Sequence, residues 1–306
     1  MRYNSFMKSK NLKVSVLMSC YNDEELLRKN LPKIMEMVLV SKDKVLEIIV
    51  VDDGSTDGSG SYIRENFPQI KLIKHKLNRG VTAAYNTGVR MAKGDLVLTI
   101  STDMIPRKNI LSYLLPYFSD EKTFAVSFHE KNLGPEKAIW REGLIQFKQK
   151  KESSYSNRTF YIRKGEGIFR RKMWMELGGM DEKLFSPFFW EDLDLSYRAA
   201  KMGYKNLWEP QARVEHTHLG AAGKLSKKYI EKLGQIHMLL FIWKNIQSKN
   251  LMRKHFIGIL RKIFKDPKYI LVVFSAVGKI GTVIKLRKKM KKEGRISDEA
   301  IFASLG

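Results

Sequence analysis

The chain has 306 residues, of which 43% are hydrophobic and 11% aromatic, so it can bury a full-sized core and lacks the depleted composition of a disordered protein. Its single cysteine, Cys20, excludes an intramolecular disulfide bond and a cysteine-cluster metal site, and it favours a reducing compartment. The formal net charge of +24 indicates a negatively charged partner, either a polyanion or a surface of anionic lipid headgroups. Residues 1–8 contain no apolar stretch of signal-peptide length, so we expect no export signal.

Short apolar runs alternate with amphipathic stretches through the first hundred residues. This alternation is typical of βαβ units and predicts a nucleotide-binding α/β half with a mainly parallel sheet flanked by helices. The predicted strands are Val14–Met18, Glu47–Val51, Lys71–Lys74 and Leu96–Ile100, and the predicted helices are Glu24–Val40, Ser59–Asn66 and Val81–Ala92.

The periodicity weakens from about residue 110, where we expect a helix at 111–118, a strand at 125–127 and a polar stretch at 148–158. This middle part is predicted to form a second subsite. After Gly223 the chain becomes lysine-rich, with apolar helix faces at 236–246 and 269–284. Lys244 and Lys279 interrupt these faces, so helices lying in a membrane interface are expected rather than membrane spans.

Acidic residues follow two of the predicted parallel strands. Asp52 and Asp53 come after one strand, and Asp103 comes after Ser101 and Thr102 at the end of another. The carboxyl ends of parallel strands meet at one crevice, where open α/β sheets bind ligands. Asp53 could accept a hydrogen bond from a nucleoside or belong to a simple turn. Asp103 could bind a divalent metal or cap a helix.

Several motifs, in this order and spacing, resemble family 2 of the nucleotide-sugar glycosyltransferases. The resemblance covers roughly residues 12–245 and implies a GT-A fold, a Rossmann-like mixed and mainly parallel sheet, here followed by a basic helical C-terminal extension. It also implies a nucleotide-sugar donor. The motifs are Val14–Asn22, Val50–Asp57, Asn78–Asp95, Leu177–Glu182, Trp190–Leu195 with Arg198, and Pro210–His216.

The resemblance assigns donor-binding roles along the predicted crevice. It places Ser19, Tyr21 and Asp53 against the nucleoside, with Tyr21 stacked on the base, although Tyr21 could instead be a core aromatic residue. It also places Gly167, in the turn Gly165-Glu166-Gly167, beside the donor sugar, where close backbone approach requires glycine.

The resemblance also implies a divalent metal, Mn²⁺ or Mg²⁺, that neutralises the charge of the leaving nucleoside diphosphate. Most family members have Asp-x-Asp after the fourth strand, whereas this chain has Ser101-Thr102-Asp103. Only the second acid is kept, as in polysaccharide rhamnosyltransferase-like members. Asp103 and His216 are the expected metal ligands, with His218 as the alternative to His216.

The segment Trp190–Asp194 is where the resemblance places the catalytic base, on Asp192. A carboxylate there takes the proton from an acceptor hydroxyl, and a displacement with a single carboxylate implies inversion at the anomeric carbon. Trp190, Glu191 and Asp194 are expected to contact the acceptor or support the site. The alternative is that these acids only stabilise the start of a helix at 193–202.

The organisation expected from these patterns is a nucleotide-sugar-binding half at 1–110, an acceptor-binding and catalytic half of the same domain at 111–222, and a basic amphipathic region at 223–306. Residues 224–295 contain 20 lysines and arginines against three acids. With Phe241, Trp243, Phe256, Phe264 and Phe274, this region predicts association with an anionic membrane.

The predicted function is inverting transfer of a sugar to a hydroxyl of a saccharide or lipid-linked acceptor in cell-surface polysaccharide synthesis. We expect it at the cytoplasmic face of the cell membrane. Two other functions are considered. One is a catalytically inactive family member that acts as a membrane or partner-binding scaffold. The other is a nucleic-acid-binding protein, which is disfavoured because no nucleic-acid fold signature is present and the charge lies outside the α/β part.

Overall fold

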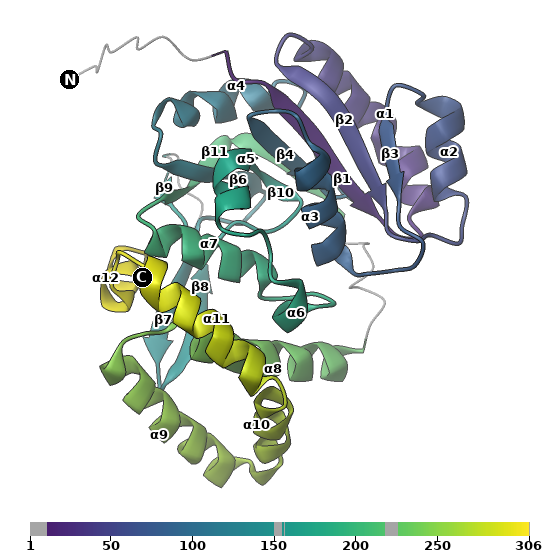
Figure 1. The fold of residues 1–306 in the computed structure, drawn as a ribbon. Coiled ribbons are helices and arrows are strands. Elements are labelled where there is room, and N and C mark those ends of the chain that lie inside the picture. The colour runs from purple at the N-terminus through teal and green to yellow at the C-terminus, as the bar shows by residue number, and fades with distance from the viewer. Residues whose placement is uncertain (1–10, 150–154, 156, 218–225, 306) are drawn as a thin grey trace, which may run out of the picture.

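A computed structural model describes residues 11–149, 155, 157–217 and 226–305 of the chain (Figure 1). His218, the alternative to His216, lies outside the described residues. The strands are β1 (Val14–Cys20), β2 (Val45–Asp52), β3 (Lys71–Lys74), β4 (Leu96–Ile100), β5 (Met104–Pro106), β6 (Thr123–Glu130), β7 (Glu136–Arg141), β8 (Leu144–Gln149), β9 (Asn157–Arg158), β10 (Glu166–Arg170) and β11 (Lys205–His216).

Helices connect and cover these strands, and two short 3₁₀ helices lie at Leu115–Ser119 and Pro267–Tyr269. The α-helices are α1 (Glu24–Val40), α2 (Ser59–Asn66), α3 (Val81–Met91), α4 (Ile110–Leu114), α5 (Arg171–Glu176), α6 (Glu182–Phe185), α7 (Glu191–Lys201), α8 (Lys227–Asn245), α9 (Lys249–Lys265), α10 (Ile270–Val277), α11 (Ile280–Glu293) and α12 (Asp298–Leu305).

The central sheet has the strand order β3-β2-β1-β4-β10-β6-β11-β5, with β9 paired to β11. The strands β1 to β4 pair in parallel, and β6 pairs in parallel with β11. Strand β10 runs antiparallel between β4 and β6. The α/β fold class and the mainly parallel sheet expected from the sequence are therefore confirmed.

Alternate residues of β1 pack on opposite faces of the sheet, as the pleat of a strand requires. Val16 and Met18 pack in a core that includes residues of α1, α2 and α4. Leu17 packs on the other face, in a core that includes residues of α3, α5 and α7. The sheet is thus covered by helices on both faces, which leaves its edge of strand ends as the place for a site.

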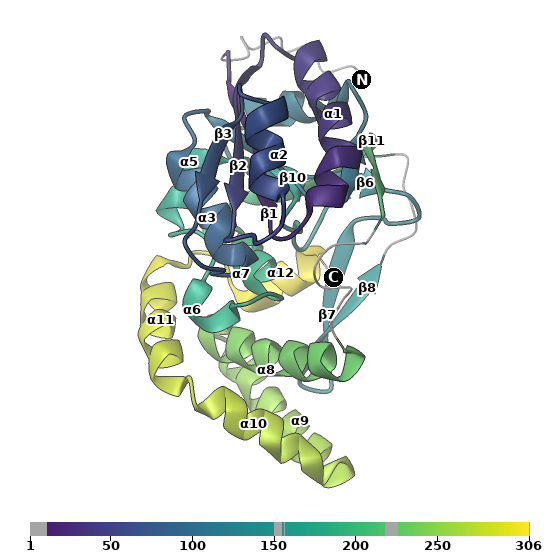
Figure 2. The ribbon, with the colours of Figure 1, turned by 90° about the vertical axis from the view of Figure 1, so that its right-hand side faces the viewer.

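A third core joins the hairpin β7–β8 to the helices α6 to α12. The helices α9 and α10 lie at the end of the molecule away from β1, β2 and β3 in both ribbon views (Figures 1 and 2). Leu193 and Tyr197 of α7 belong to this third core, whereas Leu195 of the same helix belongs to the core of the sheet. The helix α7 therefore connects the α/β part to the C-terminal helices.

One expectation for the C-terminal region was wrong. Phe241 and Trp243 are buried in the third core, because the apolar face of α8 packs inside the protein. The stretch 269–284 is divided into α10 and α11 at Gly278 and Lys279. No single helix among the described residues is long and apolar enough to cross a membrane, while the pair Pro267–Val277 and Ile280–Lys291, bent by 67°, passes that test together.

Candidate active site

The ends of β1 and β4 bring the first predicted donor residues together. The Tyr85 hydroxyl of α3 hydrogen-bonds the side chains of both Ser19 and Ser101. Tyr21 follows β1, and its side chain is 37% exposed. Its interpretation as a core aromatic residue is therefore wrong, and its ring remains accessible for stacking.

Asp53 follows β2 and is buried. One carboxylate oxygen, Oδ1, accepts from Nδ1 of His75 at 2.6 Å and from the backbone N–H of Arg79 at 3.0 Å. The other oxygen, Oδ2, accepts from the N–H groups of Arg79 and Gly80 at 3.2 and 2.8 Å. A carboxylate has about four lone-pair sites, and these four contacts occupy them. Asp53 therefore holds the loop 75–80 in place. Its contact with a nucleoside stays a prediction.

Asp103 and His216 meet because β11 pairs with β5, with His216 opposite Met104. Nε2 of His216 lies 3.2 Å from Oδ1 of Asp103. Two ligands at adjacent positions of an octahedral metal lie about 3 Å apart, so this oxygen–nitrogen pair fits Mn²⁺ or Mg²⁺. No helix begins at Asp103, since β5 follows it directly, and its interpretation as a helix cap is wrong.

Two further carboxylates face the other ring nitrogen of His216. Nδ1 lies 3.2 Å from Glu130 Oε2 and 3.8 Å from Glu166 Oε1. Glu130, Glu166 and His216 each offer a ligand atom within 4.8 Å of the others. Burial acts to lower the pKa of His216, but hydrogen bonding to Asp103 and the surrounding carboxylates raise it to about 9. This corner of the site is therefore built to attract a cation.

The predicted base, Asp192, lies in the first turn of α7, which begins at Glu191. Trp190 precedes the helix in a left-handed conformation, with φ of 74°. The Asp192 side chain is largely buried, and its Oδ1 accepts the N–H of Leu193 at 2.8 Å. An acidic first turn also stabilises the helix start, so the catalytic and the helix-start interpretations both fit this position.

The two acids beside Asp192 point into the protein. Glu191 is fully buried and pairs with Lys164. Asp194 is fully buried and accepts from Arg198, Lys244 and Asn245 at 2.8 Å each. Because α7 is helical, Asp194 points elsewhere than Asp192, and it supports the fold behind the site rather than lining it.

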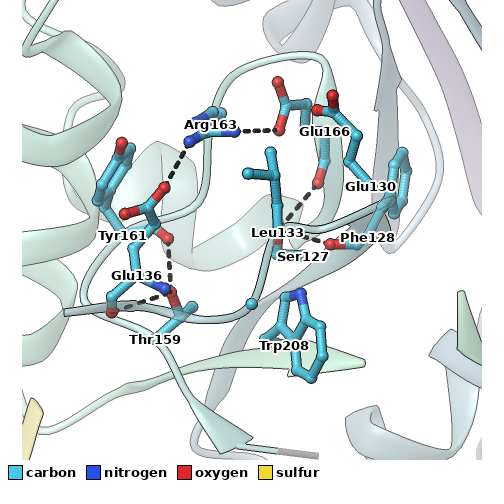
Figure 3. Close-up of a pocket in the computed structure, with 11 residues that line it drawn as sticks. Ser127, Phe128, Glu130, Leu133, Glu136, Thr159, Tyr161, Arg163, Glu166 and Trp208 are labelled. Atoms are coloured by element: carbon cyan, nitrogen blue, oxygen red, sulfur yellow. Dashed lines mark hydrogen bonds and ion pairs between the residues drawn. The ribbon is translucent and has the colours of Figure 1, made fainter. Parts of the chain in front are cut away.

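A pocket next to Asp192 contains charged and aromatic side chains that the sequence did not single out. Figure 3 shows Arg163 between Glu136 and Glu166, with ion pairs to both. Burial raises the pKa values of both glutamates, and the negative charge of Asp192 adds to each shift. Asp192 therefore lies near this pocket, and Glu166 links it to His216. The residues that line the pocket are Ser127, Phe128, Glu130, Leu133, Gly134, Glu136, Thr159, Tyr161, Arg163, Glu166 and Trp208.

The two glycines at the start of β10, Gly165 before it and Gly167 within it, have different roles. Gly165 has a φ of 75°, and a Cβ there would lie 2.1 Å from Ser101 Oγ. Gly167 lies within β10, where a Cβ would lie 2.5 Å from Ile162 Cγ2 and 2.9 Å from the Val126 carbonyl oxygen. Packing against Ile162 and Val126 thus explains the glycine at 167, and its contact with the donor sugar stays a prediction. Gly165 is the glycine whose backbone approaches Ser101 closely.

The family model of glycosyl transferase family 2 matches residues 15–178, more than half of the chain. The chain belongs to this family. A probable glycosyltransferase of Bacillus subtilis (strain 168), YdaM, is 30% identical over 220 residues, which are 65% of this chain and 49% of YdaM. The pre-mycofactocin glycosyltransferase of Mycobacterium tuberculosis (strain CDC 1551 / Oshkosh) is 29% identical over 59% of this chain and 39% of its own length. The chain thus spans half or less of these curated relatives.

Solved structures share the GT-A fold. The mannosyltransferase of Pyrobaculum calidifontis, solved with GDP-Man and Mn²⁺, has a TM-score of 0.58 at 18% identity and covers 93% of this chain and 86% of its own. GalNAc-T7, solved with UDP, GalNAc and Mn²⁺, has a TM-score of 0.60 at 17% identity, over 78% of this chain and 48% of its own. These likenesses confirm the expected fold.

Proposed function

We propose that this family member is an inverting glycosyltransferase that moves a hexosyl or deoxyhexosyl group from a nucleoside diphosphate to an acceptor hydroxyl. The observation that carries the proposal is that the Asp103–His216 pair and Asp192 both interact electrostatically with Glu166. Glu166 lies 3.8 Å from His216, and Asp192 acts on the pKa of the same carboxyl group. A candidate base and a candidate metal site therefore occupy one region of the site.

The donor side of the proposal rests on the exposed ring of Tyr21 and on the edge formed by Ser19 and Asp103. Asp103 and His216 would hold Mn²⁺ or Mg²⁺, which supplies positive charge to the departing diphosphate. The Mn²⁺ in the two solved neighbours supports this choice of metal.

Asp192 is the group proposed to take the proton from the acceptor hydroxyl. Its side chain is largely buried, and its negative charge adds to the raised pKa values of Glu136 and Glu166, which line the pocket of Figure 3. Relatives named poly-beta-1,6-N-acetyl-D-glucosamine synthases, from Staphylococcus epidermidis and Staphylococcus aureus, support a role in cell-surface polysaccharide synthesis. A lipid-linked saccharide is the proposed acceptor.

Replacing Asp192 with asparagine tests the proposal. Removal of a general base lowers kcat by about 10²- to 10⁴-fold, so D192N should lose turnover of nucleotide sugars with Mn²⁺ while it still binds the nucleoside diphosphate. The control is D43N, at an exposed position. Turnover by D192N at the wild-type rate would contradict the role of Asp192. A folded wild-type chain that turns over no common nucleotide sugar would favour the inactive scaffold, which Ser101 in place of the first acid also suggests.

We also propose that α9, α10 and α11 contact an anionic membrane, at the cytoplasmic face of the cell membrane. Phe256, Leu260 and Phe264 follow one another at helical spacing on α9, and Phe264 is 89% exposed. Leu271 and Phe274 on α10 are exposed as well. Basic side chains surround them on the same helices. Apolar side chains interleaved with basic ones suit a lipid surface better than a phosphate backbone, which needs charge alone.

Vesicle flotation tests this surface. The double variant F264S/F274S should float less with vesicles that contain phosphatidylglycerol, because it loses two of the exposed apolar side chains that would enter the interface. The matched control is L39S/L77S, which removes two exposed apolar side chains from the α/β part. High salt should also release the wild-type chain. Equal flotation of both double variants would overturn this membrane surface, and release from vesicles by added RNA would favour a nucleic-acid partner.

A further inference from the structure

Lys164 is a largely buried lysine that the proposed function does not yet use. It lies between β9 and β10, and its side chain is 20% exposed. Its ammonium group pairs with Glu191, whose carboxylate is fully buried. Burial acts to lower the pKa of Lys164, but the carboxylates of Glu191 and Asp192 outweigh it, so that the pKa lies above its ordinary value. The group therefore stays charged inside the site.

The backbone next to Lys164 is pressed against the end of β4. The carbonyl of Gly165 accepts the N–H of Ser101 at 3.1 Å. A Cβ on Gly165 would lie 2.1 Å from Ser101 Oγ and 2.8 Å from the hydroxyl of Tyr85, which itself bonds Ser19. The position of Lys164 is thus fixed between the donor-binding edge of the sheet and the start of α7.

The donor site next to Lys164 needs positive charge to bind a diphosphate. The side chain that lies against Gly165 at the end of β4 is the neutral Ser101, and the acid Asp103 follows two residues later. The leaving diphosphate still needs positive charge close to it. An ammonium group has three N–H donors, so Lys164 can keep its pair with Glu191 and donate to a phosphate oxygen as well.

We propose that Lys164 binds the diphosphate of the donor nucleotide, with Glu191 holding its ammonium group in place. The inference rests on the proposed function, since the diphosphate is that of the donor. Lys164 is then a donor-binding residue, and Glu191 acts through Lys164. Contact with the diphosphate predicts that the loss of Lys164 weakens binding of a nucleoside diphosphate far more than binding of the nucleoside alone.

Calorimetry with UDP, GDP and the two free nucleosides in the presence of Mn²⁺ tests this. Because K164M leaves Glu191 buried without its partner, the decisive comparison is between E191Q and the double variant K164M/E191Q, which removes both charges. E191Q keeps an oxygen that can accept from the ammonium group of Lys164, so it should still hold Lys164 in place and bind the nucleoside diphosphate close to wild type. The double variant should bind it about 10- to 100-fold more weakly, as expected for one charge-assisted hydrogen bond. K164R should recover part of the affinity.

Three outcomes separate the possibilities. If E191Q and the double variant both bind the diphosphate as tightly as the wild-type chain, Lys164 does not contact it and the inference is overturned. If E191Q alone weakens binding as much as the double variant does, the ion pair only holds α7 in place, which also overturns it. If the wild-type chain binds neither UDP nor GDP, the proposed function itself fails, and that result precedes any comparison of variants.

Discussion

His237 is a buried histidine on α8 that makes stability depend on pH. Its Nδ1–H donates to the Phe189 carbonyl at 3.0 Å, and its ring packs edge-on against Phe185. Burial lowers the pKa of His237 to about 4. The folded state therefore favours the neutral ring. The contribution of the neutral His237 ring to the unfolding free energy is fully present above about pH 6.5, the pKa expected in the unfolded chain. It is lost as the pH falls through 4.

The variant H237N keeps an N–H group near Nδ1 but does not titrate. Between pH 6.5 and 4 we expect the wild-type chain to lose up to about 3 kcal/mol more of its unfolding free energy than H237N loses. Urea unfolding at several pH values measures this difference. Parallel pH profiles for the two proteins would show that His237 is not kept neutral in the folded state.

Glu130 lies beside the expected metal ligand His216, with its Oε2 3.2 Å from Nδ1 of the ring. A metal-binding histidine usually gives its second N–H to a carboxylate, which fixes the tautomer and the ring orientation. E130Q should therefore weaken Mn²⁺ binding by about 10- to 100-fold, measured from the electron paramagnetic resonance signal of free Mn²⁺. E65Q, at an exposed position, removes the same charge and should leave the affinity unchanged. Equal Mn²⁺ affinities of the two variants would exclude this role.

At the scale of elements, the first hundred residues were predictable and the later ones less so. The predicted helices Glu24–Val40 and Ser59–Asn66 match α1 and α2, because their apolar period and their boundary signals are local. The hairpin β7–β8 was not predicted, since its strands are short and are defined by pairing with each other. The apolar face of α8 was visible in the sequence, but what covers it was not.

The same limit applies to the candidate site. Asp103 could be noticed from its place after a strand, and Asp192 and His216 followed from the family resemblance. Glu130 and Lys164 carry no local signal, because pairing of β6, β10 and β11 across the sheet and the packing of α7 bring them to the site. Contacts made through the tertiary fold are not encoded in any short motif.

Gly258 on α9 shows how closely two elements approach. A Cβ there would lie 2.2 Å from the Glu142 carbonyl oxygen, in the turn between β7 and β8. G258A should destabilise the fold by about 1–3 kcal/mol through overpacking, although alanine is the better helix former by about 1 kcal/mol. The control is G234A on α8, where, among the described residues outside the helix backbone, no atom lies within 4 Å of the added Cβ. It should stabilise the chain slightly. Thermal unfolding measures both, and a gain of stability in G258A would contradict the close contact.

At the scale of the whole molecule, buried ion pairs tie the C-terminal helices to the α/β part. Lys244 of α8 pairs with Asp181 and Asp194 at 2.8 Å each. Asp298 at the start of α12 pairs with Lys201 of α7 at 2.8 Å. The expected division at 222 and 223 stays a prediction, but both sides of it share a core and these charges. Removal of the basic region would leave the acid Asp194 without one of its two cations.

Lys244 therefore offers a test of whether the molecule unfolds as one body. K244M leaves Asp194 with Arg198 as its one cation, and we expect a loss of about 3 kcal/mol, at the low end for breaking a buried ion pair. K249M, at an exposed position, should change stability by less than about 0.5 kcal/mol. Hydrogen exchange locates the effect. If the parts are one cooperative unit, K244M accelerates exchange in β1 and α3 as much as in α8, because all of them open together. Acceleration confined to α8–α12 would instead show that the basic helices open on their own, as a separate domain would.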